Sequence, residues 1–235
     1  REKRTTLADL VAGLTRDDPR FRNKLALAGL EGIKKARPAA IYSKRFLPLI
    51  SVGNFEDDWA MLAECDWIVE VVVERLDIKQ QVFARLEAVR KPGAIVSSNT
   101  SGLPIAKMLD GRSPEFRKNF LVTHFFNPVR YMRLLEIVAG TDTDPEVVKF
   151  MADFGQFRLG KGIVYGKDTP NFVGNRIGVY AIQATIHAMI EMDYQADEVD
   201  VITGPPMGHP KSASFGTIDL VGLDTMVHVV RTLRE

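Results

Sequence analysis

Apolar and polar positions along the chain alternate between short strand-like runs and longer helical stretches. The run 67–73, which reads WIVEVVV, is almost all β-branched, so it predicts a parallel strand buried on both faces. Other short apolar runs predict strands at 50–52, 94–98, 122–126, 134–138 and 162–165. Helical patterns lie between them at 54–63, 77–89 and 144–157. This alternation is typical of a doubly wound α/β sheet, which binds ligands at the carboxyl ends of its strands.

The first part of the chain predicts two helices, at 6–14 and 19–37, separated by a polar break. Pro19 suits the first turn of the second helix, and the side chain of Asp18 can cap it. These helices precede the first expected strand.

The pattern of apolar and polar residues changes after Lys167. A long, almost uninterrupted helix is predicted from Pro170 to about Met192, and the remainder has helical or loop character. We therefore expect two domains: residues 1–167 as a partial Rossmann-like, doubly wound parallel sheet, and residues 168–235 as a smaller all-helical domain.

Composition narrows the class of protein. The chain has 235 residues, 46% of them hydrophobic, and a formal net charge of +1. Such a balance gives no reason to expect attraction to nucleic acid or to an anionic membrane surface. No apolar run approaches the length of a membrane span, so membrane insertion is not expected. The single cysteine, Cys65, cannot form an internal disulfide, which fits a reducing compartment, and we expect a cytoplasmic location.

Candidate chemistry centres on His124 and Glu136, which lie twelve positions apart in neighbouring strand-like runs. A polar turn joins the two runs, so adjacent strands would bring these side chains together. A carboxylate that accepts the imidazole N–H fixes the tautomer and raises the basicity of the other ring nitrogen, as a general base requires. The alternative is a core histidine satisfied by a neighbouring carbonyl group. The other histidines lack metal-like spacing, so no metal site is expected.

Several motifs in a fixed order carry a family resemblance. They are SNTS at 98–101, HFFNP at 124–128 with Glu136 twelve residues after the histidine, and DTPNFVGNR at 168–176. The chain resembles the 3-hydroxyacyl-CoA dehydrogenase family from about Phe55 to Val227. The runs HPKSASF at 209–215 and VGLDT at 221–225 are most similar to those of the long bacterial family members that act in fatty-acid degradation.

The resemblance implies an NAD-dependent oxidoreductase that converts (S)-3-hydroxyacyl-CoA to 3-oxoacyl-CoA in fatty-acid β-oxidation. It implies His124 as general base, Glu136 as its orienting partner, and Ser101 and Asn175 as polar partners of the substrate oxygen or thioester carbonyl. Residues at the positions of Glu74, Lys79, Ser101 and Asn127 contact the NAD cofactor in the family. Family members also dimerise through the helical domain, so a homodimer is expected.

These assignments compete with simpler structural roles. Ser101 follows a strand and Asn175 lies near the start of a long helix, so both could act only as caps. Glu74 and Lys79 could form a solvated ion pair at the start of a helix.

One element of the expected fold is missing from the sequence. A dinucleotide-binding domain usually opens with a strand and G-x-G-x-x-G at a helix start, with an acidic residue about 20 positions later. No such motif occurs here. We therefore expect the chain to lack the first βαβ unit of its family, and the fragment alone to be inactive.

Three functions remain open on the sequence. The first is the NAD-dependent 3-hydroxyacyl-CoA dehydrogenase, and the second is a related hydroxy-acid or sugar-acid dehydrogenase. The third is a non-catalytic fragment that acts only as a folding or association module. Equilibrium binding of NADH separates the third from the others, and activity on acetoacetyl-CoA separates the first two.

Overall fold

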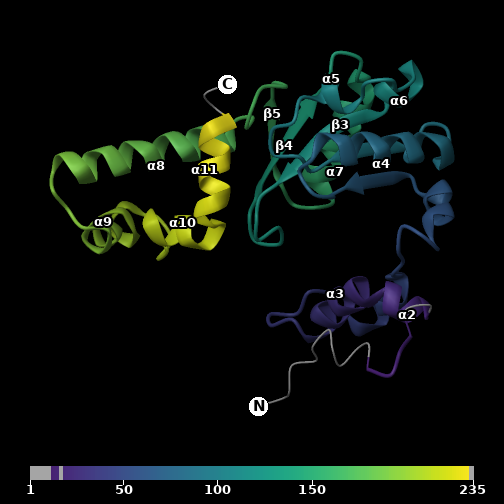
Figure 1. Ribbon diagram of the computed structural model, residues 1–235, viewed down its shortest axis with the longest axis horizontal. Coiled ribbons are helices and arrows are strands. Elements are labelled where there is room, and N and C mark those ends of the chain that lie inside the picture. The colour runs from purple at the N-terminus through teal and green to yellow at the C-terminus, as the bar shows by residue number, and fades with distance from the viewer. Residues whose placement is uncertain (1–11, 16–17, 233–235) are drawn as a thin grey trace. The chain divides into compact units, whose positions relative to one another are not determined.

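The computed structural model describes residues 12–15 and 18–232 of the chain (Figure 1). The fold divides into two compact units. The first comprises Arg1–Cys65 with Val89–Lys91, and the second comprises Asp66–Ala88 with Pro92–Glu235.

The first unit is built from short helices. They are α2 (Pro19–Arg22), α3 (Lys24–Lys35), and the 3-10 helices η1 (Lys44–Leu49) and η2 (Trp59–Glu64). The carboxylate of Asp18 accepts a hydrogen bond of 2.8 Å from the amide of Arg20, so the predicted cap is confirmed. The helix predicted over 19–37 is interrupted at Asn23, and most of the helix predicted at 6–14 lies outside the described residues.

Two predictions in the first unit are wrong. Residues 50–52 are extended but pair with no strand among the described residues, and the helix predicted at 54–63 exists only as the short η2. The amides of Glu56 and Asp57 donate to the side chain of Asn54, both at 2.9 Å. This local side-chain turn satisfies backbone donors that a helix would otherwise use, and so delays the start of the helix.

The second unit contains a five-stranded sheet in the order β1-β2-β3-β4-β5. The strands are β1 (Trp67–Glu70), β2 (Ile95–Ser98), β3 (Phe120–Phe125), β4 (Leu134–Ala139) and β5 (Gly162–Gly166). All neighbours are parallel except β3 and β4, which are antiparallel. A parallel connection needs a crossover of a dozen or more residues, whereas only residues 126–133 join β3 to β4, so this pair forms a hairpin.

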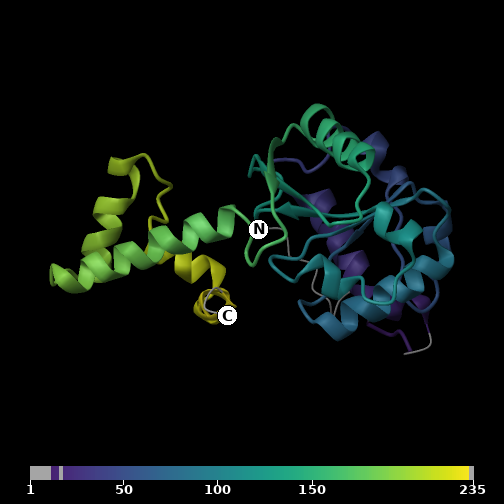
Figure 2. The ribbon, with the colours of Figure 1, turned by 90° about the horizontal axis from the view of Figure 1, so that it is seen from above.

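Helices cover both faces of the sheet (Figure 2). One face carries α7 (Pro145–Phe157), which packs over a core that includes Leu121, Leu135, Ile137 and Met151. The other carries α4 (Leu76–Val89), α5 (Ile105–Met108) and α6 (Pro114–Lys118). On this face the rings of Phe116 and Phe120 stack, and Phe83 meets Phe120 edge to face and Phe116 at a tilt. The fold is therefore a Rossmann-like layered sheet.

Strand β1 differs from its prediction. It ends at Glu70 rather than at Val73, and Val71 and Val73 are 67% and 60% exposed, so burial on both faces is wrong for this run. The amide of Val72 donates to the carboxylate of Glu70 at 2.6 Å instead of joining a ladder. Because β1 is the edge of the described sheet, its outer side has no neighbour to bury these valines.

The last part of the chain is helical, as predicted, and runs from green to yellow in Figure 1. It comprises α8 (Gly174–Glu191), α9 (Ala196–Thr203), the 3-10 helix η3 (Pro205–Met207), α10 (Phe215–Val221) and α11 (Leu223–Thr232). Val179, Ile218 and Met226 form its small apolar core. The long helix begins at Gly174 rather than at Pro170, because Asn171 and Phe172 have φ values of 61° and 47°. Within the described residues, no helix combines the length and apolar character needed to cross a bilayer.

Candidate active site

His124 and Glu136 face each other across the hairpin. The register of β3 and β4 pairs the two residues directly, and His124 Nδ1 lies 2.6 Å from Glu136 Oε2. Both side chains are buried, at 4% and 0% exposure. Side chains alternate along a strand, so this pair lies on one face of the sheet while Leu135 and Ile137 lie on the other. The predicted pairing is confirmed.

The second oxygen of Glu136 is also fully engaged. Its Oε1 accepts hydrogen bonds from the amides of Val173 at 2.9 Å and Gly174 at 2.6 Å, at the start of α8. Burial raises the pKa of Glu136, but the hydrogen bonds from His124 and from the two amides outweigh it, and the net pKa lies below its ordinary value. The carboxylate is therefore ionised, and it accepts the proton of His124 Nδ1–H.

This tautomer leaves Nε2 of the neutral imidazole as an acceptor. The hydroxyl of Ser101 lies 3.3 Å from Nε2, so it can donate to that nitrogen. The rings of Phe126 and Phe172 contact the imidazole edge to face, with centroid distances of 4.5 Å and 5.6 Å. The rings of Phe126 and Phe172 and the carboxylate of Glu136 thus fix the orientation of the imidazole. Beside Ser101, Nε2 can take up a proton, and the imidazolium that forms can return it.

Glu74 lies beside the Ser101 loop. Its carboxylate accepts hydrogen bonds from the hydroxyl of Thr100 and, at 3.1 Å, from the amide of Ser101. Its side chain remains 38% exposed, so it is open to a ligand.

Lys79 is 1% exposed and lies beneath this surface. Its ammonium group contacts Glu70 at 2.8 Å and 2.9 Å and Glu74 at 3.2 Å. The alternative of a solvated pair at the helix start therefore does not fit Lys79. Through its contact with Glu74, Lys79 holds that carboxylate next to the loop.

The two predicted site asparagines follow β3 and begin α8. Asn127 is exposed and follows β3 directly, and Asn175 is half-buried at the second position of α8, one residue after Gly174. Neither side chain makes a hydrogen bond to another described residue. Their amide groups are therefore available to a ligand, and their assigned roles stay predictions.

Sequence reasoning missed three contributors. Glu70 pairs with Lys79 and accepts a hydrogen bond from the Ser98 hydroxyl at 2.5 Å. The hydroxyl of Thr100 donates to the carboxylate of Glu74, and the ring of Phe172 packs against the imidazole of His124. A lone carboxylate inside the apolar run 67–73 was an available signal for Glu70. Phe172 had no such signal, because its contact depends on a left-handed backbone. Across the described part of the chain, no three His, Cys, Asp or Glu side chains form a group that could hold a metal ion.

Two curated relatives match nearly the whole chain. A probable 3-hydroxyacyl-CoA dehydrogenase of Bacillus subtilis is 50% identical over 223 residues, which cover 95% of this chain and 28% of that protein. A protein of the same description from Deinococcus radiodurans is 45% identical over 220 residues, covering 94% of this chain and 64% of that protein. The chain thus spans less than two thirds of the length of either relative.

Solved structures agree with this match. FadB2 of M. tuberculosis superposes with a TM-score of 0.75 at 27% identity, covering 96% of this chain and 74% of that chain. The 3-hydroxybutyryl-CoA dehydrogenase of Escherichia coli superposes with a TM-score of 0.72 at 26% identity, covering 89% of this chain and 44% of that chain.

Two family profiles together account for most of the sequence. The one described as "3-hydroxyacyl-CoA dehydrogenase, NAD binding domain" matches residues 18–169. The one described as "3-hydroxyacyl-CoA dehydrogenase, C-terminal domain" matches residues 172–235. The chain belongs to the 3-hydroxyacyl-CoA dehydrogenase family.

Proposed function

We propose that the protein containing this chain is an NAD-dependent dehydrogenase of (S)-3-hydroxyacyl-CoA, acting in fatty-acid β-oxidation. The observation that carries the proposal is the line of contacts from Ser101 through His124 to Glu136. It presents a neutral imidazole nitrogen and a hydroxyl group at the carboxyl ends of parallel strands β2 and β3.

The residues of this line support alcohol oxidation. His124 Nε2 takes the proton of the substrate hydroxyl, while a hydride leaves the carbon that bears this hydroxyl. Glu136 stays ionised and stabilises the imidazolium that forms, because its lowered pKa keeps it from taking the proton itself. Ser101 and Asn175 donate hydrogen bonds to the substrate oxygens. In the reverse direction, the protonated imidazole polarises the 3-oxo group and returns the proton.

The polar groups around this line fit one end of the cofactor. Glu74, Ser101 and the exposed Asn127 all follow carboxyl ends of parallel strands, where a doubly wound sheet binds dinucleotides. Their carboxylate, hydroxyl and amide groups match a ribose and a carboxamide. NAD, when bound there, supplies the hydride acceptor. The phosphate-binding glycine motif has no counterpart in this sequence.

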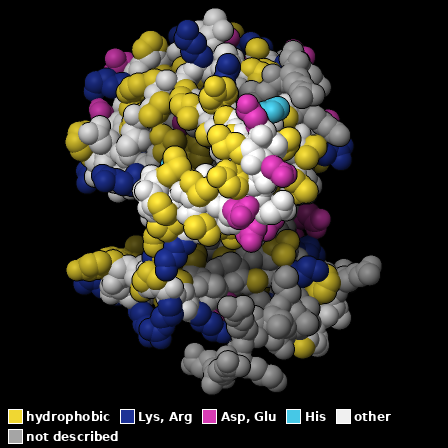
Figure 3. Space-filling model, turned by 90° about the vertical axis from the view of Figure 1, so that its left-hand side faces the viewer, with side chains coloured by type: hydrophobic (Ala, Val, Ile, Leu, Met, Phe, Trp, Pro, Cys, Tyr) yellow, Lys and Arg dark blue, Asp and Glu magenta, His cyan; other side chains and the backbone are white. Residues whose placement is uncertain are grey.

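A homodimer formed through the helical part is also proposed. Ile177 and Tyr180 of α8 and Leu220 of α10 are 65%, 77% and 80% exposed. Figure 3 shows apolar side chains gathered on the side of Figure 1 where these helices are drawn. An apolar patch of this kind on a soluble protein usually marks an interface.

The domain boundary at Lys167 and the cytoplasmic location stay predictions. The location rests on the composition and on the single Cys65.

The test uses the full-length enzyme that carries this chain, with acetoacetyl-CoA and NADH. Replacement of His124 by Ala is expected to lower kcat by roughly 10²–10⁴ with little change in KM, as for loss of a general base. His187, which is exposed on α8, provides the matched control as His187→Ala. Equal activity of the His124→Ala and wild-type enzymes would contradict the proposal, and turnover of free acetoacetate but not of its CoA ester would favour the hydroxy-acid alternative.

A further inference from the structure

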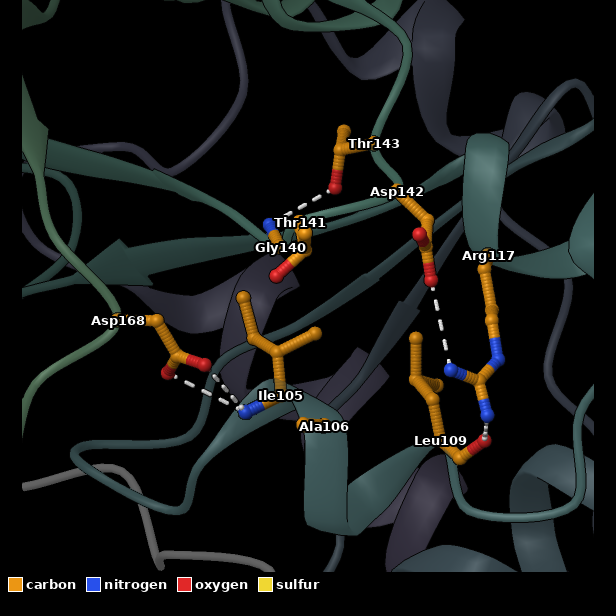
Figure 4. A pocket seen from close by; sticks show the side chains of 9 residues that line it. All are labelled: Ile105, Ala106, Leu109, Arg117, Gly140, Thr141, Asp142, Thr143 and Asp168. Atoms are coloured by element: carbon orange, nitrogen blue, oxygen red, sulfur yellow. Dashed lines mark hydrogen bonds and ion pairs between the residues drawn. The ribbon is translucent and has the colours of Figure 1, made fainter.

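Asp168 holds the start of α5 although it is 63 residues away in sequence. The amide of Ile105 donates to both oxygens of its carboxylate, at 3.2 Å and 3.0 Å (Figure 4). The amide of Ala106 also favours the charged form of this carboxylate and so acts to lower its pKa. Since α5 follows the loop 101–104 directly, Asp168 anchors the end of the loop that begins at Ser101.

Two close contacts leave this loop little freedom. A Cβ atom on Gly102 would lie 2.7 Å from the amide nitrogen of Asn171, so the loop backbone touches the backbone of the segment that contains Asp168. A Cβ atom on Gly140 would lie 2.8 Å from Cγ2 of Ile105, so α5 also rests against the end of β4. The loop is therefore held on two sides, with Asp168 providing the polar attachment between them.

The same segment, residues 168–174, also contacts the other two members of the line from Ser101 through His124 to Glu136. Phe172 contacts the imidazole of His124, and the amides of Val173 and Gly174 donate to Glu136. Asn171 and Phe172 hold left-handed backbone angles while 3% and 2% exposed. Backbone conformations of this kind persist when surrounding contacts determine them, and they occur often at functional sites.

We infer that Asp168 is a positioning residue, which holds the hydroxyl of Ser101 against Nε2 of His124. The inference rests on the proposed function, because it assigns Ser101 to the reaction. Hydrogen bonds from backbone amides to a carboxylate are stronger than those to a neutral amide oxygen, and the side chain of asparagine would also direct its NH₂ group toward the donors. Asp168→Asn should therefore loosen the loop without emptying its space.

Burial raises the pKa of Asp168, and the hydrogen bonds from the amides of Ile105 and Ala106 oppose that rise. The charged carboxylate thus depends on the loop amides, just as the loop depends on the carboxylate.

The first experiment does not require activity. Hydrogen exchange at the amides of Ile105 and Ala106 and the ¹⁵N NMR signal of His124 Nε2 are compared between the wild-type chain and Asp168→Asn. Faster exchange and a shifted Nε2 signal are expected. Asp142→Asn is the matched control, because Asp142 lines the same cavity of about 70 Å³ but is 53% exposed, and its carboxylate pairs with Arg117. Unchanged exchange and an unchanged Nε2 signal in Asp168→Asn would overturn the inference.

The second experiment is a double-mutant cycle in the full-length enzyme. Asp168→Asn is expected to lower kcat roughly 10-fold to 100-fold, as small misplacements do, with KM nearly unchanged. In a Ser101→Ala background the same substitution should have almost no further effect on kcat. A full additional loss in that background would overturn the inference. Asp168→Glu, which keeps the charge, provides a second cycle with the same criterion should Asp168→Asn not fold. An inactive wild-type enzyme would count against the proposed function, whereas the exchange experiment still decides the role of Asp168.

Discussion

Glu136 shows how single side chains determine this site. It is fully buried, yet both of its oxygens accept hydrogen bonds, one from His124 and two from the backbone at the start of α8. An ionised carboxylate is costly to bury unless it is satisfied in this way. The same residue therefore orients the imidazole and caps the long helix.

Replacement of Glu136 by Gln should lower the free energy of unfolding at pH 7 by about 1–3 kcal/mol, because buried donors lose a charged acceptor. The pKa of Glu136 is lowered in the folded protein, so its contribution to stability is present above its ordinary value of 4.5 and is lost as the pH falls through the folded pKa. The acid-induced loss of stability should thus be smaller in the variant. Urea unfolding at pH 7 and at lower pH measures both effects, with the exposed Glu191→Gln as control. An identical acid dependence in variant and wild type would contradict this account.

At the scale of elements, the backbones of the Ser101 loop and of the segment 168–174 approach each other closely. Nothing larger than hydrogen fits at Gly102, where the amide nitrogen of Asn171 occupies the place of a side chain. Each element is short or irregular, so their mutual packing, rather than intrinsic propensity, fixes their shape.

Gly102→Ala is expected to destabilise the protein by about 1–3 kcal/mol, as an overpacked core site does, and to displace Ser101 from His124. Gly29→Ala in α3 is the matched control, and its effect on stability should have the opposite sign. That glycine lies in a helix with nothing within 4 Å of an added Cβ, so alanine should stabilise the protein by about 0.5–1 kcal/mol. Chemical denaturation of the two variants measures the difference. A neutral Gly102→Ala would show that the loop can move away from Asn171.

At the scale of the whole molecule, the exposed apolar side chains of the helical part are the basis of the proposed homodimer. The two glycines of α8, Gly174 and Gly178, differ in the space around them. A Cβ atom on Gly174 would lie 2.6 Å from Cζ of Phe126, whereas one on Gly178 would meet nothing within 4 Å. The face around Gly178 is therefore open to a partner helix.

Tyr180→Glu on α8 should weaken self-association at least tenfold, because it would put a charge into the proposed interface. Sedimentation equilibrium of the chain measures the association constant. Phe157→Glu is the control, since Phe157 is 73% exposed but lies at the end of α7 on the sheet. A wild-type chain that remains monomeric at high concentration would count against the homodimer.

Residues 1–235 alone should bind NADH weakly. The polar groups at the strand ends suit the ribose and nicotinamide, but the sequence has no glycine-rich helix start to hold the pyrophosphate through backbone amides. Each charge-assisted hydrogen bond that is not made forgoes roughly 1.5–3 kcal/mol, so we expect a millimolar or weaker Kd. Isothermal titration calorimetry measures it. Micromolar affinity would reveal a phosphate site that the sequence does not indicate, and would also remove the alternative of a non-catalytic module.

The sequence by itself determined the elements whose signals are local. Periodicity placed the five strands and the helices α4 and α7 within a few residues, although not the short helices α5 and α6. Asp18 caps the helix that follows it directly in sequence. The short connection between the runs at 122–126 and 134–138 required a hairpin, and a hairpin with this register brings His124 opposite Glu136. The family motifs then pointed to the chemistry.

Only the tertiary structure decided the features that depend on distant partners. Lys79 is buried because Glu70 and Glu74 neutralise it, whereas the sequence left open the alternative of a solvated pair at the helix start. The amides of Val173 and Gly174 at the start of the long helix donate to a carboxylate 37 and 38 residues earlier in the sequence. The valines after β1 are exposed because no strand of the described sheet lies beside them. In each case the free energy depends on which groups meet in space, and short-range sequence patterns do not contain that information.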